Sequence, residues 1–223
     1  GGGAAGGAGG PRRGAGWGGA RVCAARHAGG DAGSGPGALA RRGRLSGERP
    51  ITLGSVTGKT LGLVGFGRIG QAMARRGRGF EMNIIYADPR RLPPDEEAKF
   101  EAGYRSFDDL LREADFVSLH PQLSPETRHL MSDRQFALMK PTAFVINTSR
   151  GPVIDEAALV RALQEKKIAG AGLDVFEHEP QVSLELVKMP NVVLTPHLGS
   201  AVLELREGMA HVVVDNTIAL IEG

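Results

Sequence analysis

The sequence contains a single cysteine, Cys23, so no disulfide can form within the chain, and a reducing compartment such as the cytoplasm is expected. It also lacks an apolar run long enough to span a membrane and the apolar core of a secretory signal peptide, so no membrane partner is expected. Its histidines do not stand near cysteines or paired acids at the spacing of metal ligands. We therefore expect no metal site.

Large apolar side chains are nearly missing from residues 1–50, where Gly, Ala, Arg and Pro supply 40 of the 50 residues. Such a segment cannot bury enough apolar surface to offset its ordering entropy, so we expect it to be disordered and the folded domain to occupy 51–223. The segment carries a net charge of +6 and the whole chain +2, so the remainder carries −4. Because no aromatic residues alternate with its Arg-Gly pairs, we expect no nucleic-acid partner.

From residue 60 onward, short apolar runs alternate with capped or amphipathic segments, the pattern of β-α-β units. We expect strands at 60–64, 82–87, 115–120, 142–147, 170–175 and 191–194. We expect helices at 68–79, from Asp95, from Ser106, from Ser132 to Pro141, from Asp155 to about 167, and over 200–221. This pattern predicts an α/β fold, a doubly wound parallel sheet with helices on both faces.

A glycine-rich turn separates the first expected strand from the first expected helix. Gly65 allows a tight turn, Gly67 lets the backbone approach a pyrophosphate, and Gly70 lets the helix pack closely on the strand. The free N–H groups at the start of the helix, at the positive end of its dipole, would hold the phosphates. The turn therefore predicts a dinucleotide site of the Rossmann type.

Asp88 ends the second expected strand, eighteen residues after Gly70. A carboxylate at this place accepts hydrogen bonds from the adenosine ribose of NAD and would repel the 2′-phosphate of NADP. Arg90 and Arg91 follow at once and could pair with that phosphate if the loop turned them inward. We expect NAD, with NADP as the less favoured alternative.

Reactive side chains follow three later strands: Arg150, Glu179 and His197. In open parallel sheets, ligands bind beyond the carboxyl ends of the strands, so the three residues are expected along one rim. Packing does not explain an arginine, a glutamate and a histidine at successive strand ends. His120 closes another strand at the wall of the expected pocket, where we assign it a structural or cofactor-adjacent role.

The chain from about residue 57 to 223 resembles the NAD-binding domain of the D-isomer-specific 2-hydroxyacid dehydrogenases. Four motifs carry the resemblance, in order: Gly-Phe-Gly-Arg-Ile-Gly from Gly65, Asn-Thr-Ser-Arg-Gly from Asn147, Asp-Val-Phe-Glu-His-Glu-Pro from Asp174, and Thr-Pro-His-Leu-Gly from Thr195. The first motif is most similar to the glyoxylate and hydroxypyruvate reductase branch, and phosphoglycerate dehydrogenase is a further relative.

The resemblance implies hydride transfer between NAD(H) and C2 of a small 2-keto or 2-hydroxy acid. It implies that Arg150 binds the substrate, that His197 is the acid/base, and that Glu179, rather than Glu177, is the partner of His197. It also implies cofactor contacts at Gly65, Gly67, Arg68, Ile69, Gly70, Asp88, Thr148, Ser149, Arg150, Asp174, His197 and Gly199.

The resemblance further implies a homodimer, and a substrate domain ahead of the NAD-binding domain. The composition of residues 1–50 does not fit that domain. Two functions stay open: an oxidoreductase of small 2-keto acids, and an NAD-binding fragment with little or no turnover because the substrate domain is missing. An NAD-sensing corepressor of similar architecture ranks last, because its partner groove would lie in the missing domain.

Overall fold

The structure, a computed structural model, describes residues 55–199 and 201–222, so the expectations for residues 1–50 lie outside the described residues. The strands are β1 (Thr60–Val64), β2 (Asn83–Ala87), β3 (Ala102–Tyr104), β4 (Phe116–Leu119), β5 (Phe144–Asn147), β6 (Gly170–Leu173) and β7 (Val192–Leu194). The helices are α3 (Arg68–Gly79), α4 (Pro94–Phe100), α5 (Phe107–Glu113), α6 (Asp133–Phe136), the 3-10 turn η2 (Gly151–Val153), α7 (Glu156–Gln164), α8 (Leu184–Lys188) and α9 (Leu203–Glu222).

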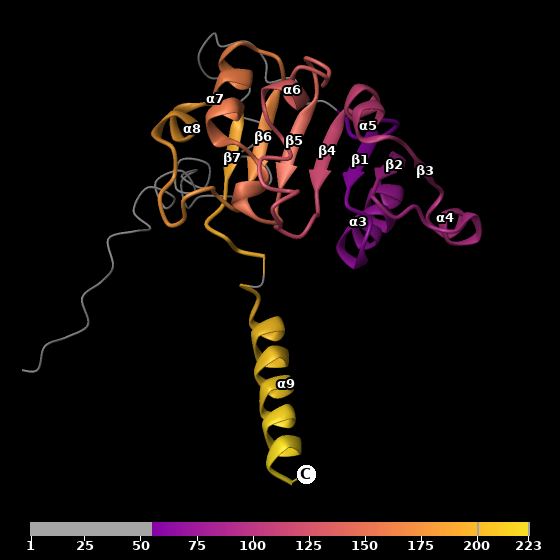
Figure 1. Ribbon diagram of the computed structural model, residues 1–223, viewed down its shortest axis with the longest axis vertical. Helices are drawn as coiled ribbons and strands as arrows, with labels where there is room; N and C mark the ends of the chain where they lie inside the picture. Colours follow the sequence, from indigo (N-terminus) through magenta and orange to yellow (C-terminus); the bar gives the residue numbers. More distant parts are fainter. Residues whose placement is uncertain (1–54, 200, 223) are drawn as a thin grey trace, which may run out of the picture.

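The seven strands form one sheet in the order β3-β2-β1-β4-β5-β6-β7, and every neighbouring pair is parallel (Figure 1). The chain leaves β1 toward one edge of the sheet and returns beside it with β4. The expected doubly wound parallel sheet is confirmed. All carboxyl ends of the strands therefore meet at one rim, with the switch in strand order between β1 and β4.

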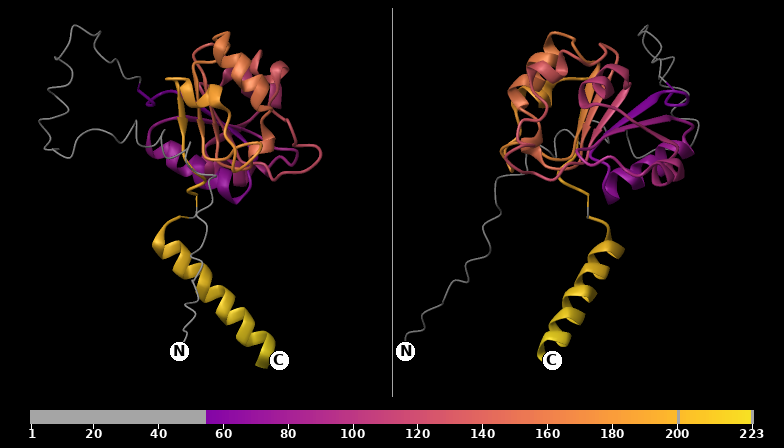
Figure 2. Two further views of the ribbon diagram at one scale, coloured as in Figure 1. Left: turned by 90° about the vertical axis from the view of Figure 1, so that its left-hand side faces the viewer. Right: turned by 45° about the vertical axis from the view of Figure 1, so that its right-hand side comes forward.

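Apolar residues on the two faces of the sheet form two separate cores. Leu61 and Leu63 of β1 pack with Ala74 of α3 on one face. Val64 points to the other face and joins the larger cluster, to which α5, α6, α7 and α8 contribute buried residues such as Leu110. Figure 2 shows helices on both sides of the sheet. Strands covered on both faces become apolar throughout, as the sequence of β1 is.

Local signals in the sequence fix several helix starts. The Ser106 side chain accepts a hydrogen bond from the Asp109 N–H at 3.2 Å and caps α5, and Asp155 caps α7 through the Ala158 N–H at 3.0 Å. Ser132 and Gln135 form the capping box at the start of α6. Each cap satisfies an N–H group that has no partner inside its helix.

The sequence-based boundaries were wrong at several helix and strand ends. The helix expected to run from Ser132 to Pro141 ends as α6 at Phe136, and the one expected to reach 167 ends as α7 at Gln164, because Lys166 has a left-handed backbone with φ +57°. The short strand β3 and the short helix α8 were not expected. The Gly in the middle of β3 weakens its strand signal.

The closing helix expected over 200–221 is present as α9, although residue 200 itself lies outside the described residues. α9 extends away from the sheet in Figures 1 and 2, and none of its residues is buried. Its exposed apolar side chains include Val213 and Leu220, which are 64 % and 84 % exposed. None of the helices in the described ranges has the length and apolar content of a membrane span.

Candidate active site

The turn between β1 and α3 has the backbone that the glycine motif predicts. Gly65 has φ +87°, and a β-carbon there would lie 2.9 Å from the backbone of His120. A β-carbon at Gly70 would lie 2.3 Å from the Gly65 carbonyl oxygen, so α3 could not approach β1 as closely with any other residue. At Gly67 a β-carbon would meet no atom within 4 Å. The turn is therefore closed against the protein at Gly65 and Gly70, and open to a ligand at Gly67.

The first turn of α3 presents N–H donors beside this opening. No side chain caps α3, whose N-cap residue is Gly67, and the neighbouring Arg68 and Ile69 are exposed. Ile69 is 67 % exposed although it is apolar. Free N–H groups at a helix start, together with the helix dipole, favour a bound phosphate.

Asp88 lies beside the glycine turn at the end of β2. One carboxylate oxygen accepts the Phe66 N–H at 2.8 Å and the other accepts the Arg90 N–H at 2.9 Å. Each oxygen keeps a lone pair for a further donor. The guanidinium of Arg91 pairs with Glu97 at 2.9 Å and lies over the Tyr104 ring at 5.2 Å, so it is held on the side of α4.

The loop after β5 is organised by Asn147, which is 1 % exposed. Its side-chain oxygen accepts the Ser149 N–H at 3.0 Å and its side-chain N–H group donates to the Arg150 carbonyl at 2.9 Å. Thr148 and Arg150 are exposed, and Arg150 donates to the Ser149 carbonyl at 2.6 Å. One amide thus shapes the loop and leaves the Arg150 guanidinium with donors for a ligand. Asn147 was not among the expected site residues, although a polar residue at the end of a buried strand was a visible signal.

Glu179 and His197 meet at the carboxyl ends of β6 and β7. The Nδ1 atom of His197 lies 3.0 Å from Oε2 of Glu179, and Oε1 of Glu179 accepts the Phe176 N–H at 3.0 Å. The two side chains are 45 % and 31 % exposed, so the imidazole can reach a ligand while its other nitrogen is held. A carboxylate in this place orients the ring and fixes which nitrogen is engaged.

The His197 loop is held in a strained shape by Asp174. His197 has φ +54°, a left-handed conformation that costs a residue with a β-carbon roughly 1 kcal/mol. Asp174, which is 8 % exposed, accepts the Leu198 N–H at 2.8 Å, the Gly199 N–H at 3.1 Å and the Thr195 hydroxyl. Asp174 and Gly199, both expected near the cofactor, are thus bonded to each other and shape the histidine loop.

His120 directly follows β4 and lies against the glycine turn, and its backbone N–H donates to the Val64 carbonyl at 2.8 Å. Its Nε2 atom lies 3.0 Å from the hydroxyl of Ser118, which is 2 % exposed. Burial lowers the pKa of His120 from 6.5 to about 4. His120 is therefore a neutral part of the wall at neutral pH.

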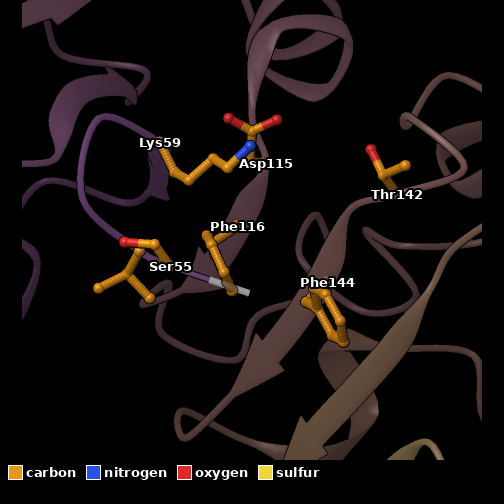
Figure 3. A pocket seen from close by; sticks show the side chains of 7 residues that line it. Ser55, Lys59, Asp115, Phe116, Thr142 and Phe144 are labelled. Atoms are coloured by element: carbon orange, nitrogen blue, oxygen red, sulfur yellow. The ribbon is translucent and has the colours of Figure 1, made fainter. Parts of the chain in front are cut away.

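A hollow of about 380 Å³ lies at the opposite edge of the sheet, where the strands begin (Figure 3). Lys59 and Asp115 line one side of it, and Thr142 and Phe144 the other. The rings of Phe116 and Phe144 stack there with centroids 5.6 Å apart. None of the expected site residues lines this hollow. In the described part of the chain, no group of three or more His, Cys, Asp or Glu residues could hold a metal ion.

Comparison with known proteins places this chain in a family. The sequence profile described as "D-isomer specific 2-hydroxyacid dehydrogenase, NAD binding domain" matches residues 37–199. The chain belongs to this family. It is 57 % identical over 166 residues to a glyoxylate reductase of Thermococcus litoralis, covering 74 % of this chain and 50 % of that protein. The chain therefore spans about half the length of the curated relatives it matches.

Solved structures of this dehydrogenase family agree with the fold. A glyoxylate reductase from Paecilomyes thermophila is 43 % identical, with a TM-score of 0.74 over 84 % of this chain and 56 % of that one. An NAD-complexed D-isomer specific 2-hydroxyacid dehydrogenase from Lactobacillus delbrueckii ssp. bulgaricus is 31 % identical, with a TM-score of 0.72 over 83 % of this chain and 60 % of that one. The glycine turn with its opening at Gly67, and Asp88 beside it, fit the dinucleotide that this domain type binds.

Proposed function

We propose that this chain binds NADH and carries the acid/base part of a reductase that converts a small 2-keto acid, of the glyoxylate or hydroxypyruvate kind, into the 2-hydroxy acid. The observation that carries the proposal is the contact of 3.0 Å between His197 and Glu179 at the rim of a dinucleotide-binding sheet. The names of the similar glyoxylate reductases support the choice of substrate class.

In the proposed reaction, bound NADH supplies a hydride to C2 of the keto acid. His197, as imidazolium, donates its Nε2 proton to the oxygen at C2, so the carbonyl becomes a hydroxyl and the imidazole is left neutral. Glu179 accepts the Nδ1 hydrogen bond and holds the ring with Nε2 free for the transfer. Arg150 binds the carboxylate with a planar pair of donors. In the reverse direction His197 takes the proton back.

For the cofactor we propose NAD(H) rather than NADP(H). Asp88 holds a carboxylate next to the glycine turn, where a 2′-phosphate would meet a like charge. Arg91, which could have paired with that phosphate, is engaged by Glu97. We further propose a homodimer that acts in the cytoplasm, as expected from the resemblance and from the single cysteine.

A second function is a fragment that binds NAD but turns over little or no substrate. The observation that favours it is the coverage of only about half of the similar reductases. Catalysis of hydride transfer depends on excluding water and on orienting the keto acid, which a second domain closing over the rim would provide.

Titration of the purified 223-residue chain with NADH, followed by nucleotide fluorescence, tests the proposal. We expect saturable binding, and glyoxylate-dependent NADH oxidation far below the usual enzyme range of about 1 to 1000 per second. His197→Asn should lower that oxidation by about 100-fold or more and change the NADH affinity less than about twofold. Absence of NADH binding would overturn the proposal. Oxidation at an ordinary enzyme rate would instead exclude the fragment.

A further inference from the structure

Glu177 is a nearly buried carboxylate that the proposed reaction does not use. Its side chain is 8 % exposed, although it lies only two residues before Glu179. Its Oε1 atom is 2.5 Å from Nε2 of His129 and 3.2 Å from a guanidinium nitrogen of Arg128. Burying a carboxylate costs free energy unless it is paired, and the contacts with His129 and Arg128 offset that cost for Glu177.

A second set of contacts joins Glu177 to the start of α7. Its Oε2 atom accepts the Glu156 N–H at 3.2 Å, while its own N–H donates to Oε1 of Glu156 at 2.5 Å. The two residues are thus bonded in both directions, backbone of each to side chain of the other. Glu156 follows Asp155, the N-cap of α7, so the contact joins residues 176–180 to the segment that leads from the Arg150 loop into this helix.

The Arg150 loop touches the same place through its backbone. A β-carbon at Gly151 would lie 1.8 Å from the Phe176 carbonyl oxygen and 2.6 Å from the Glu177 nitrogen. The His129 N–H donates to the Pro152 carbonyl at 2.8 Å. Three segments therefore meet at Glu177: residues 128–131, residues 150–156 with Arg150 at their start, and residues 176–180 with Glu179.

The orientation of Glu179 depends on this junction. Its Oε1 atom accepts the Phe176 N–H at 3.0 Å, and Phe176 is the residue whose carbonyl lies against Gly151. The same carboxylate faces His197 through Oε2. A shift of the backbone at residues 176–177 would consequently turn the Glu179 carboxylate away from the Nδ1 atom of His197.

The charges around Glu177 agree with this role. Burial acts to raise the pKa of Glu177, but the hydrogen bonds from His129 and from the Glu156 N–H outweigh it, so the pKa is lowered. Burial raises the pKa of Glu156, as does the negative charge of Glu177. Both oxygens of Glu177 are thus engaged, Oε1 by Arg128 and His129 and Oε2 by the Glu156 N–H.

We propose, on the basis of the proposed acid/base role of His197, that Glu177 is a positioning residue for the reaction. It ties the loop of Arg150 to the loop of Glu179, and thereby keeps the Glu179 carboxylate on Nδ1 of His197.

The test is the tautomer of neutral His197, read from imidazole ¹⁵N chemical shifts in the whole 223-residue chain. While Glu179 accepts from Nδ1–H, the ring carries its proton on Nδ1. In Glu177→Ala we expect the ratio of the Nδ1–H to the Nε2–H form to fall by about tenfold, the order of a lost hydrogen bond to a charged group. In Glu177→Gln, which keeps one acceptor oxygen, this ratio should lie between those of Glu177→Ala and the original chain.

Glu185→Ala is the matched control, because this carboxylate on α8 bonds to Ser183 and to no residue of the three segments. It should leave the tautomer unchanged. A folded Glu177→Ala chain with the His197 tautomer of the original chain would overturn the proposal, and so would an original chain whose His197 is of the Nε2–H form. If Glu177→Ala does not fold, His129→Ala decides: a smaller shift in the same direction supports the proposal and no shift overturns it.

This measurement needs neither NADH nor turnover. A chain that binds no NADH but shows the tautomer shift would refute the proposed function and keep Glu177 as the residue that orients Glu179. A chain that binds NADH but shows no tautomer shift would refute the positioning role of Glu177 and leave the proposed function standing.

Discussion

His197 and Glu179 are eighteen residues apart in the chain, yet Nδ1 of the imidazole lies 3.0 Å from Oε2 of the carboxylate. The pair joins the ends of two neighbouring strands, β6 and β7, at the rim where parallel sheets bind ligands. Because Nδ1 is engaged by the carboxylate, Nε2 is the nitrogen that can exchange a proton with a ligand. The pair therefore assigns a separate task to each nitrogen.

The first prediction concerns the chemistry of this pair. His197→Asn should lower the single-turnover rate of glyoxylate-dependent NADH oxidation by about 100-fold or more, the usual worth of a positioned acid. Glu179→Gln should lower the rate less, because the imidazole remains. NADH affinity should change less than about twofold in both variants. A matching loss in His178→Asn, an exposed histidine beside Glu179, would contradict the assignment.

The second prediction separates two glycines of the turn. Gly70→Ala should lower the free energy of unfolding by about 1 to 3 kcal/mol, because its β-carbon would meet the Gly65 carbonyl oxygen at 2.3 Å. Gly67→Ala should leave the stability nearly unchanged, since its β-carbon would enter open space, but should weaken NADH binding about tenfold or more. Thermal unfolding and fluorescence titration measure the two effects. Unchanged NADH affinity in Gly67→Ala would mean that the pyrophosphate of the ligand does not approach the backbone at Gly67.

The third prediction concerns the choice of cofactor. Asp88→Ser should weaken NADH binding by about tenfold, because a ribose partner and the bond to the Phe66 N–H are both altered. NADPH binding should improve relative to NADH, since the carboxylate that repels the 2′-phosphate is gone. Titrations with both nucleotides give the ratio of affinities. Asp95→Asn, an exposed acid in the first turn of α4, is the control and should not change it.

The fourth prediction is a dependence of stability on pH that arises from His120. The pKa of this histidine is lowered from 6.5 to about 4 in the folded chain, so between these values the unfolded chain binds a proton that the folded chain does not. Stability contributed by neutral His120 is thus present above pH 6.5 and lost as the pH falls toward 4. The slope from this group approaches about 1.4 kcal/mol per pH unit.

His120→Gln should remove that contribution while keeping a partner for the Ser118 hydroxyl. Denaturant unfolding at several pH values measures the slope, and the difference between variant and original chain isolates the histidine from the carboxylates. The exposed His178 provides the control variant His178→Gln. Parallel stability curves for His120→Gln and the original chain would contradict the prediction.

Much of the fold could be predicted because its signals are local. The limits of β1 and α3 agree with the expected ones, since an apolar run, a glycine turn and an amphipathic helix each leave a pattern within a few residues. The ends of α6 and α7 could not be predicted in this way. Whether a helix stops at Phe136 or continues depends on the packing around it, and Pro141 only sets an outer limit.

The same distinction between local patterns and long-range packing applies to the candidate site. Arg150, Glu179 and His197 stand at strand ends, which a sequence shows directly. The roles of Asn147 and Glu177 could not be read in the same way. Glu177 binds His129, 48 residues earlier in the chain, and no local pattern reports a contact of that range. In the sequence Glu177 was merely a competitor for the place of Glu179.

The bonds that Asp174 already accepts limit the number of hydrogen bonds its carboxylate can accept from a ligand. Two acceptor positions on Oδ1 are taken by the Thr195 hydroxyl and the Leu198 N–H, and one on Oδ2 by the Gly199 N–H. A carboxylate has about four such positions, so a single vacant one remains. A ligand at this end of the sheet can therefore donate one hydrogen bond to Asp174 at most. A second would require breaking one of the bonds that hold the His197 loop in its shape.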